Sequence, residues 1–398
     1  MQIVTDEEAE PAGITPVRRG IVLAFAATAL VVGEFIWLTI ASAKVIDRGG
    51  DPWQTGDWLI DLSAGPVRRG LLGELFFRVI DSPNVLWLVF AVQIALLGSL
   101  CALTLVLFWH SPRTAPWLML VCSPAFLLFA PLSPEGALRK ELFGLVAFAL
   151  LAVAVRFRWR ARSLVGVVVL FALGSIAHEL TAFMLPAFVV LVLWGHRDGL
   201  WGRRTAHVAV GVIAGVALAA VVWALAFPAT SADTITICAS WVRSGLDRGL
   251  CTGALRFHSR SLSDSLELTK GMFPGYLSLV PLVVLSVVPF VALGVPRRIW
   301  RLLAVTFVGL LPLFLAGIDY GRWIYVAIAL VSLTCLATWP RGDVIAKRVP
   351  VWTAIAFVAL WSLPYAGPQT SHSLFVQLLS RPVRSLMGTP AGGPDFGP

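Results

Sequence analysis

The stretch Gly56-Asp57-Trp58-Leu59-Ile60-Asp61-Leu62-Ser63-Ala64-Gly65-Pro66-Val67-Arg68-Arg69-Gly70-Leu71-Leu72-Gly73-Glu74-Leu75 lies between two long apolar runs, at about 21–43 and 85–108. It carries two aspartates, an arginine pair and several glycines. Apolar runs of about 20 residues have the length that a helix needs to cross a bilayer. If both runs are membrane helices, this polar stretch is held at the membrane surface.

The composition places the chain in a membrane. Of its 398 residues, 58% are hydrophobic and 13% are charged, whereas a soluble domain has about 25% charged residues. The apolar runs are continuous and do not alternate as the strands of a membrane barrel do. We therefore expect an all-α polytopic protein that crosses the cell (plasma) membrane several times.

The sequence predicts about eleven transmembrane helices. The expected spans are about 21–43, 85–108, 117–132, a run ending near 155, two runs sharing 163–194 and broken at His178-Glu179, then 208–227, 277–295, a run ending near 316, 323–339 and a run ending near 365. No separate soluble domain is expected, so residues 1–398 form one transmembrane domain.

The basic residues predict the orientation. Arginines concentrate in every second short loop, and cytoplasmic loops carry this excess in membrane proteins. We therefore expect the N-terminus inside and the C-terminus outside. The expected parts outside the helices are a cytoplasmic tail over 1–19, a first outer loop over 44–84, a second outer loop over 228–274 and an outer tail over 367–398. The formal net charge of +9 then reflects topology, and no nucleic-acid partner is expected.

The first outer loop contains the candidate catalytic acids. Asp57 and Asp61 are four residues apart, and either carboxylate could act as general base on a hydroxyl; the alternative is a helix-capping or solvated acid. Arg68 and Arg69 suit phosphate oxygens, or else anchor the loop to lipid headgroups. Residues 67–79 are predicted to form an interfacial amphipathic helix.

Three further polar clusters fall on the predicted outer side. Arg139-Lys140-Glu141 offers a second phosphate contact beside an acid, or only a charged helix start. His178-Glu179 is either a site pair or a structural turn. Asp319-Tyr320-Gly321-Arg322 is either part of the site or a turn closed by its own ion pair. Charged residues at membrane depth are costly and often mark function.

The cysteines and the metal-binding motifs complete the sequence-based expectations. Cys238 and Cys251 share the second outer loop, where a disulfide is plausible chemistry for an oxidising compartment. The other three cysteines lie in apolar runs and are expected only to pack. No HExxH pattern follows His178, so no metal ligands are assigned, although a divalent metal is compatible with the acids.

This layout resembles the GT-C superfamily of integral-membrane glycosyltransferases. Those enzymes have about eleven or more helices and a long first outer loop with an acid and interfacial helices, a plan that residues 44–84 match. Asp57 or Asp61 stands in the place of the family acid, and no large outer C-terminal domain is expected. The resemblance implies transfer of a sugar from a polyprenyl-phosphate donor to a glycan or lipid acceptor at the extracytoplasmic face, in cell-envelope glycan or glycolipid synthesis.

The resemblance also implies roles for the clusters. Asp61 or Asp57 would be the base; the phosphate would be held by Arg68, Arg69, Arg139, Lys140 and Arg322; and the rest of the substrate pocket would be shaped by Glu141, His178, Glu179, Asp319 and Tyr320. Two other functions remain open from the sequence. One is a polymerase or ligase of surface polysaccharides, and the other is a transporter or flippase of a lipid-linked saccharide. Transport would need more polar residues near the midplane than Glu34 supplies.

Overall fold

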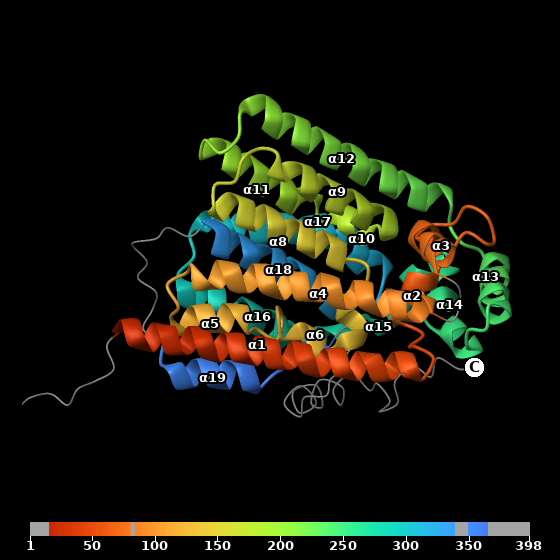
Figure 1. Ribbon diagram of the computed structural model, residues 1–398, viewed down its shortest axis with the longest axis horizontal. Helices are drawn as coiled ribbons and strands as arrows, with labels where there is room; N and C mark the ends of the chain where they lie inside the picture. The colour runs from red at the N-terminus through yellow and green to blue at the C-terminus, as the bar shows by residue number, and fades with distance from the viewer. Residues whose placement is uncertain (1–15, 81–83, 339–348, 365–398) are drawn as a thin grey trace, which may run out of the picture.

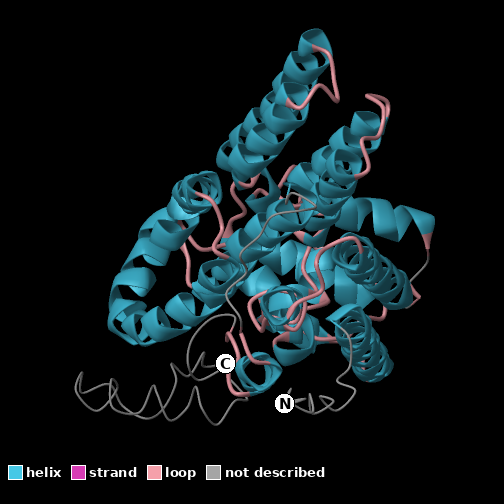
Figure 2. Ribbon diagram, turned by 90° about the vertical axis from the view of Figure 1, so that its left-hand side faces the viewer, coloured by secondary structure: helices cyan, strands magenta, loops and turns pink. Residues whose placement is uncertain are grey.

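The protein is described here by a computed structural model that covers residues 16–80, 84–338 and 349–364. Within these ranges the chain is helical and contains no strand (Figures 1 and 2). Most helices run side by side in one bundle, as Figure 1 shows. The fold class predicted from the sequence is thus confirmed as all-helical.

Among the described residues, five helices are long and apolar enough to cross a membrane. They lie in α1 (Pro16–Asp47), α4 (Val85–Trp109), α12 (Arg203–Ala226), α17 (Arg297–Ala316) and α18 (Tyr320–Thr338). Shorter apolar helices are α8 (Leu142–Arg156), α9 (Ser163–Ala177), α11 (Leu185–Arg197) and α16 (Val280–Leu293). The structure therefore supports a membrane-embedded protein, while the count of eleven crossings remains a prediction.

Helices α18 and α8 form the centre of the bundle. In α18, 94% of an 18-residue apolar window is buried, and α8 packs against α4, α9 and α18. Both helices present small residues to their neighbours, including Ala149, Ala152, Ala327 and Ala329, which are fully buried. Small side chains let helix backbones approach closely where no hydrophobic effect drives association. By contrast, the apolar window of α12 is only 22% buried, which suits a face turned to lipid.

Two predicted helices are wrong in their extent. The expected helix over 117–132 is divided into α5 (Ala115–Val121) and α6 (Phe129–Leu132). Pro124 cannot donate a backbone hydrogen bond, and the Ser123 hydroxyl instead accepts one from Ala125 N at 3.1 Å, so a turn replaces the helix. The helix expected to end near 365 is α19 (Val351–Ala359), which ends at a cap at Leu360.

Short helices from both predicted outer loops gather at one end of the bundle. The first loop forms α2 (Gly56–Leu59) and α3 (Gly70–Val79), and the second forms α13 (Ser231–Arg243), η1 (Arg248–Thr252), α14 (Ala254–His258) and α15 (Leu262–Tyr276). Figure 1 shows α2, α3, α13 and α14 together at the right-hand end. The remaining short elements are α7 (Pro134–Ala137), α10 (Leu180–Phe183) and η2 (Leu277–Leu279). The predicted outer tail over 367–398 and residues 1–15 of the predicted cytoplasmic tail lie outside the described residues.

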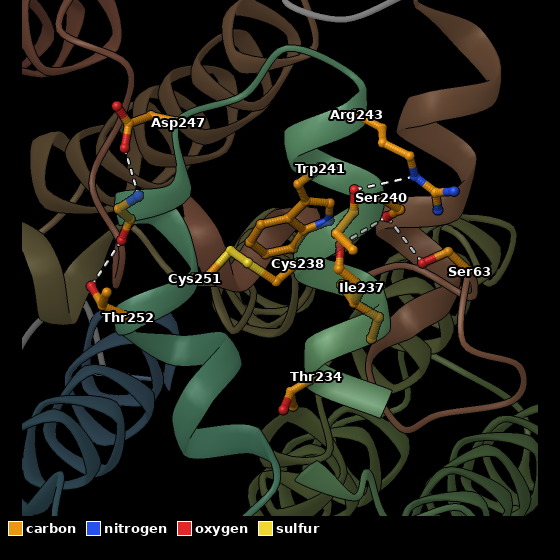
Figure 3. Close-up of a disulfide and its surroundings, with 12 residues drawn as sticks. Ser63, Thr234, Ile237, Cys238, Ser240, Trp241, Arg243, Asp247, Cys251 and Thr252 are labelled. Atoms are coloured by element: carbon orange, nitrogen blue, oxygen red, sulfur yellow. Dashed lines mark hydrogen bonds between the residues drawn. A yellow bond between two sulfur atoms is a disulfide. The ribbon is translucent and has the colours of Figure 1, made fainter. Parts of the chain in front are cut away.

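The two outer loops are joined to each other. Ala254 N donates to Pro52 O at 3.0 Å, and Arg68 N donates to Phe227 O at 2.9 Å. The predicted disulfide between Cys238 and Cys251 is confirmed, and it ties α13 to η1 (Figure 3). The two hydrogen bonds hold the second loop against the first, and the disulfide holds the second loop together.

Helix α3 lies within the span 67–79 that was predicted to form an interfacial helix, and it begins three residues later than predicted. Leu71 and Leu75 are exposed, whereas Phe76 is buried, so one apolar face is turned outward and another packs inward. Gly73 lies against the end of α2, where an added Cβ would overlap the backbone of Leu59 and Ile60. This close approach places α2 beside the start of α3.

Gly73→Ala is therefore expected to lower the free energy of unfolding by about 3 kcal/mol, because the overlap is with backbone that cannot rotate away. Gly211→Ala in the interior of α12 is the control, since nothing lies within 4 Å of an added Cβ, and it should raise the free energy of unfolding by about 0.5–1 kcal/mol through helix propensity. Thermal unfolding of the purified chain in detergent measures both. Equal stability of the two variants would contradict this packing.

Candidate functional site

Helix α2 is fixed to the bundle by its tryptophan. Trp58 is fully buried and donates its Nε1–H to Leu138 O at 2.9 Å. Gln93 of α4 donates to the same carbonyl at 2.9 Å and to Gln54 O at 3.0 Å. Buried donors that find carbonyl partners hold a segment in one position. Asp57, the residue before Trp58, is thereby set beside the segment that precedes α8.

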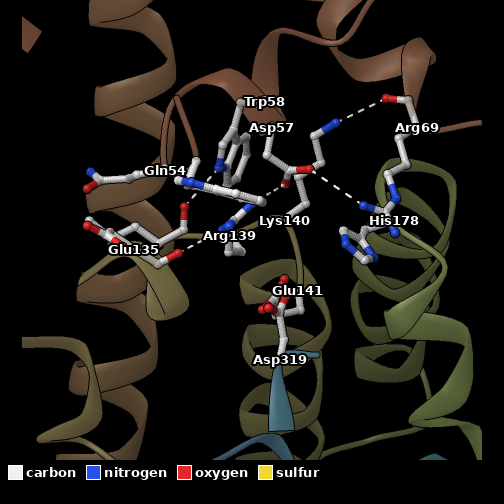
Figure 4. A network of polar contacts seen from close by, with 12 residues as sticks. Gln54, Asp57, Trp58, Arg69, Glu135, Arg139, Lys140, Glu141, His178 and Asp319 are labelled. Carbon is white, nitrogen blue, oxygen red and sulfur yellow. Dashed lines mark hydrogen bonds and ion pairs between the residues drawn. The ribbon is translucent and has the colours of Figure 1, made fainter. Parts of the chain in front are cut away.

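Asp57 lies among three basic groups. Its carboxylate is 0% exposed, with Oδ1 3.8 Å from Arg69 Nη1 and Oδ2 4.0 Å from Arg139 Nη1. Lys140 donates its Nζ to Arg69 O at 3.0 Å (Figure 4). Burial alone would raise the pKa of Asp57, but Lys140 and Arg139 hold it below its ordinary value. Neither carboxylate oxygen has a hydrogen-bond partner among the residues that the structure describes, which is uncommon for a buried acid.

Arg69 is held mainly by Glu179. Its Nε lies 2.8 Å from Oε2 and 3.1 Å from Oε1 of Glu179, and its Nη2 also pairs with Oε1. Glu179 follows the break after α9, where His178 Nδ1 accepts a hydrogen bond from Leu180 N at 3.1 Å. The neutral imidazole therefore carries its proton on Nε2, which is buried and has no hydrogen-bond partner within the described part of the chain.

A second group of charges centres on Arg322. Its Nη2 lies 2.9 Å from Asp319 Oδ2, and its Nε lies 3.4 Å from Glu141 Oε1. The internal pair of the 319–322 turn therefore exists and is extended by Glu141. The Tyr320 hydroxyl donates to Phe314 O at 2.6 Å, which turns it toward α17.

Asp61 lies apart from these groups. Its Oδ1 accepts a hydrogen bond from Ser63 N at 2.8 Å, and its Oδ2 accepts one from Trp241 Nε1 at 3.0 Å. Ser240 of α13 adds a longer contact at 3.4 Å. Asp61 thus links the first outer loop to α13, and of the two candidate bases only Asp57 joins the charged cluster.

The clusters border one cavity of about 760 Å³. Its wall includes the guanidinium-bearing residues Arg68, Arg69, Arg139 and Arg322. His178, Glu179 and Asp319 line it as well. Asp57, Lys140 and Glu141 are fully buried behind this wall. Segments far apart in the sequence, from the two outer loops and three inter-helix turns, therefore meet at one site.

The sequence interpretation missed the contribution of the second outer loop. Phe257, His258 and Arg260 of this loop also line the cavity, beside Trp53 of the first outer loop. The run Arg256-Phe257-His258-Ser259-Arg260 places basic, aromatic and hydroxyl residues together in an outer loop, and this was the signal available. Its importance depends on the docking of α14 against the first loop, which no local pattern predicts.

Metal binding was left open by the sequence. Within the described part of the chain, no group of three or more His, Cys, Asp or Glu residues is arranged to hold a metal ion. The acids of the cavity are instead neutralised by guanidinium groups.

Lys140 gives the site a measurable dependence on pH. Burial lowers the pKa of Lys140 from 10.5 to about 8, although Asp57 opposes the shift. Between these values the unfolded chain binds more protons than the folded one, so Lys140 makes the free energy of unfolding rise with pH by up to about 1.4 kcal/mol per unit. Lys140→Met should lack this rise, as measured by unfolding between pH 7 and 10. Parallel curves for the two proteins would contradict the buried charge.

Comparison with known proteins gives no relative. No protein-family model, no curated protein and no solved structure matches the chain.

Proposed function

We propose that the protein transfers a sugar from a polyprenyl-phosphate donor to a hydroxyl acceptor, in the manner of the GT-C glycosyltransferases. The observation that carries the proposal is the cavity itself: five arginines line its wall, beside acids, at one end of a bundle of apolar helices. Guanidinium groups match phosphate oxygens in shape and charge. A phosphate leaving group needs such stabilisation as its bond to the sugar breaks.

The proposal assigns the proton acceptor to Asp57. Its oxygens have no hydrogen bonds, and its contacts with Arg69 and Arg139 are long, at 3.8 and 4.0 Å. Arg69 is bound more closely by Glu179, so the Asp57–Arg69 contact is the one that breaks as substrate enters. Hydrogen bonds of catalytic groups are often formed only in the substrate complex.

Transfer of the sugar forms one bond and breaks another. The acceptor oxygen forms a bond to the anomeric carbon, while its proton passes to Asp57. The bond between that carbon and the phosphate oxygen breaks, and its electron pair stays on the phosphate. The negative charge of the donor beside Asp57 raises the proton affinity of the carboxylate, which offsets the effect of the surrounding cations.

The proposal also places the cavity on the extracytoplasmic side of the cell membrane. Figure 1 shows α2, α3, α13 and α14 at one end of the bundle, and the starts of α1 and α12 toward the other. Arg203 and Arg204 open α12, and Arg297, Arg298 and Arg301 lie in the first turns of α17. Cytoplasmic ends of membrane helices carry such an excess.

A transfer assay tests the proposed function. The full chain in nanodiscs is incubated with polyprenyl phosphates that carry labelled hexoses or pentoses, together with cell-envelope glycans or lipids as acceptors. We expect a labelled product and release of polyprenyl phosphate from one donor. Movement of an intact donor across proteoliposomes, with no bond broken, would instead support a transporter and reject the transferase.

A further inference from the structure

The arginines of the cavity divide into two kinds. Arg69, Arg139 and Arg322 each have a carboxylate oxygen within 4.0 Å. Arg68 and Arg260 have no such partner among the residues that the structure describes. A guanidinium already paired with carboxylates gains less from an incoming anion than an uncompensated one does. The positive charge available to a substrate is therefore concentrated on Arg68 and Arg260.

Arg68 is held in place by backbone groups and not by acids. Its Nη2 donates to His258 O at 2.9 Å, and its own carbonyl accepts a hydrogen bond from His258 Nε2 at 2.9 Å. Its Nε is buried and has no hydrogen-bond partner in the described ranges. Burial and the neighbouring Arg68 lower the pKa of His258, so the imidazole is neutral and adds no competing charge.

Arg260 is oriented by an aromatic ring. The centre of its guanidinium lies 4.3 Å from the centroid of Phe257, and Phe257 lies 5.5 Å from Trp53. A guanidinium that stacks on a ring keeps the N–H groups on its edge free for an oxyanion. Arg260 thus lines the cavity from the segment between α14 and α15, two residues after His258.

The disulfide and the hydrogen bonds between the loops hold these two arginines in fixed positions relative to each other. Arg68 belongs to the first outer loop and Arg260 to the second, and Cys238–Cys251 ties α13 to the segment that leads into α14. The Arg68–His258 pair then closes the junction. A site formed across two fixed loops needs little rearrangement when it binds.

We infer that Arg68 and Arg260 form the anion subsite of the cavity, which takes the phosphate or diphosphate of the substrate. Arg69, Arg139 and Arg322 then serve to position the acids. The inference rests on the proposed function and deepens it, because it assigns the anion to two residues, of which Arg260 carries no other role.

The subsite is tested by calorimetric titration of inorganic pyrophosphate into the full chain in zwitterionic nanodiscs. We expect Arg260→Gln and Arg68→Gln each to raise the Kd at least tenfold. Arg260→Lys, which keeps the charge but not the planar fork, should give an intermediate Kd. The matched control is Arg248→Gln in η1, an exposed arginine of the same loop outside the cavity, and its Kd should stay within twofold of the wild type.

Loss of the fold is checked by the melting temperature. Arg260→Gln removes only a stacking contact and should fold even if Arg68→Gln does not. Unchanged pyrophosphate affinity in a folded Arg260→Gln variant would overturn the subsite, as would absence of binding to the wild type.

Two further arms complete the design. Nanodiscs with an anionic phospholipid show whether a lipid headgroup competes with pyrophosphate. If the phospholipid raises the Kd for pyrophosphate in the wild type but not in Arg260→Gln, the subsite binds a lipid phosphate. If the Kd of the wild type is unchanged, the subsite binds a free phosphate. If no sugar transfer is found but these variants bind pyrophosphate more weakly, the anion subsite is supported and the proposed transferase function is rejected. If transfer occurs with unchanged KM in both variants, the subsite fails and the transferase stands.

Discussion

Asp57→Asn is expected to lower the rate of sugar transfer at least about 100-fold, which is the usual loss when a group essential to charge or proton transfer is removed. The amide cannot accept the hydroxyl proton, and it leaves Arg69 and Arg139 without their shared counter-charge. The transfer assay with saturating donor measures the effect.

Two other aspartates make this experiment specific. Asp61→Asn should mainly reduce stability, because Asp61 bonds to Trp241 and Ser63 away from the cavity. Asp264→Asn at the exposed start of α15 is the control and should retain full transfer. An Asp57→Asn variant that folds and transfers at the wild-type rate would remove Asp57 from the mechanism.

Arg322→Met should lower the free energy of unfolding by about 3 kcal/mol. Arg322 is 5% exposed and pairs with both Glu141 and Asp319, so its removal leaves two acids facing each other with no cation between them. Burial already raises the pKa of Glu141, and uptake of a proton by Glu141 in the variant limits the cost. Unfolding in detergent measures the change.

The control for Arg322 is an exposed ion pair. Arg78 pairs with Glu74 at 2.8 Å, but its side chain is 75% exposed, and such pairs contribute at most about 1 kcal/mol. The free energy of unfolding of Arg78→Met should therefore be close to that of the wild type. Adding Glu141→Gln to Arg322→Met should recover part of the stability, since one unpaired charge disappears. Equal stabilities of Arg322→Met and Arg78→Met would contradict a buried network.

Composition and periodicity were sufficient to predict an all-helical membrane protein. Continuous apolar runs can be satisfied in lipid only by helices that bond their own backbone. The disulfide was also predictable, because Cys238 and Cys251 share one polar loop. The division of the 117–132 run was not predicted, although Pro124 marked the position.

The site was predictable in part. Polar groups in an otherwise apolar chain are costly, and guanidinium groups suit phosphate, so Arg69, Arg139, Glu179 and Arg322 could be chosen as candidates from the sequence. The choice between Asp57 and Asp61 was not predictable, because it depends on Trp58 fixing α2 and on Trp241 binding Asp61. Arg260 was missed for the same reason: its place in the cavity follows from the docking of α14 and not from its local sequence.

A structure of the full chain in nanodiscs with bound polyprenyl phosphate tests the central claim most directly. The account predicts the phosphate in the cavity, within hydrogen-bonding distance of Arg68 and Arg260, with Asp57 behind Arg69. A phosphate bound at the opposite end of the bundle, near Arg203 and Arg298, would contradict it.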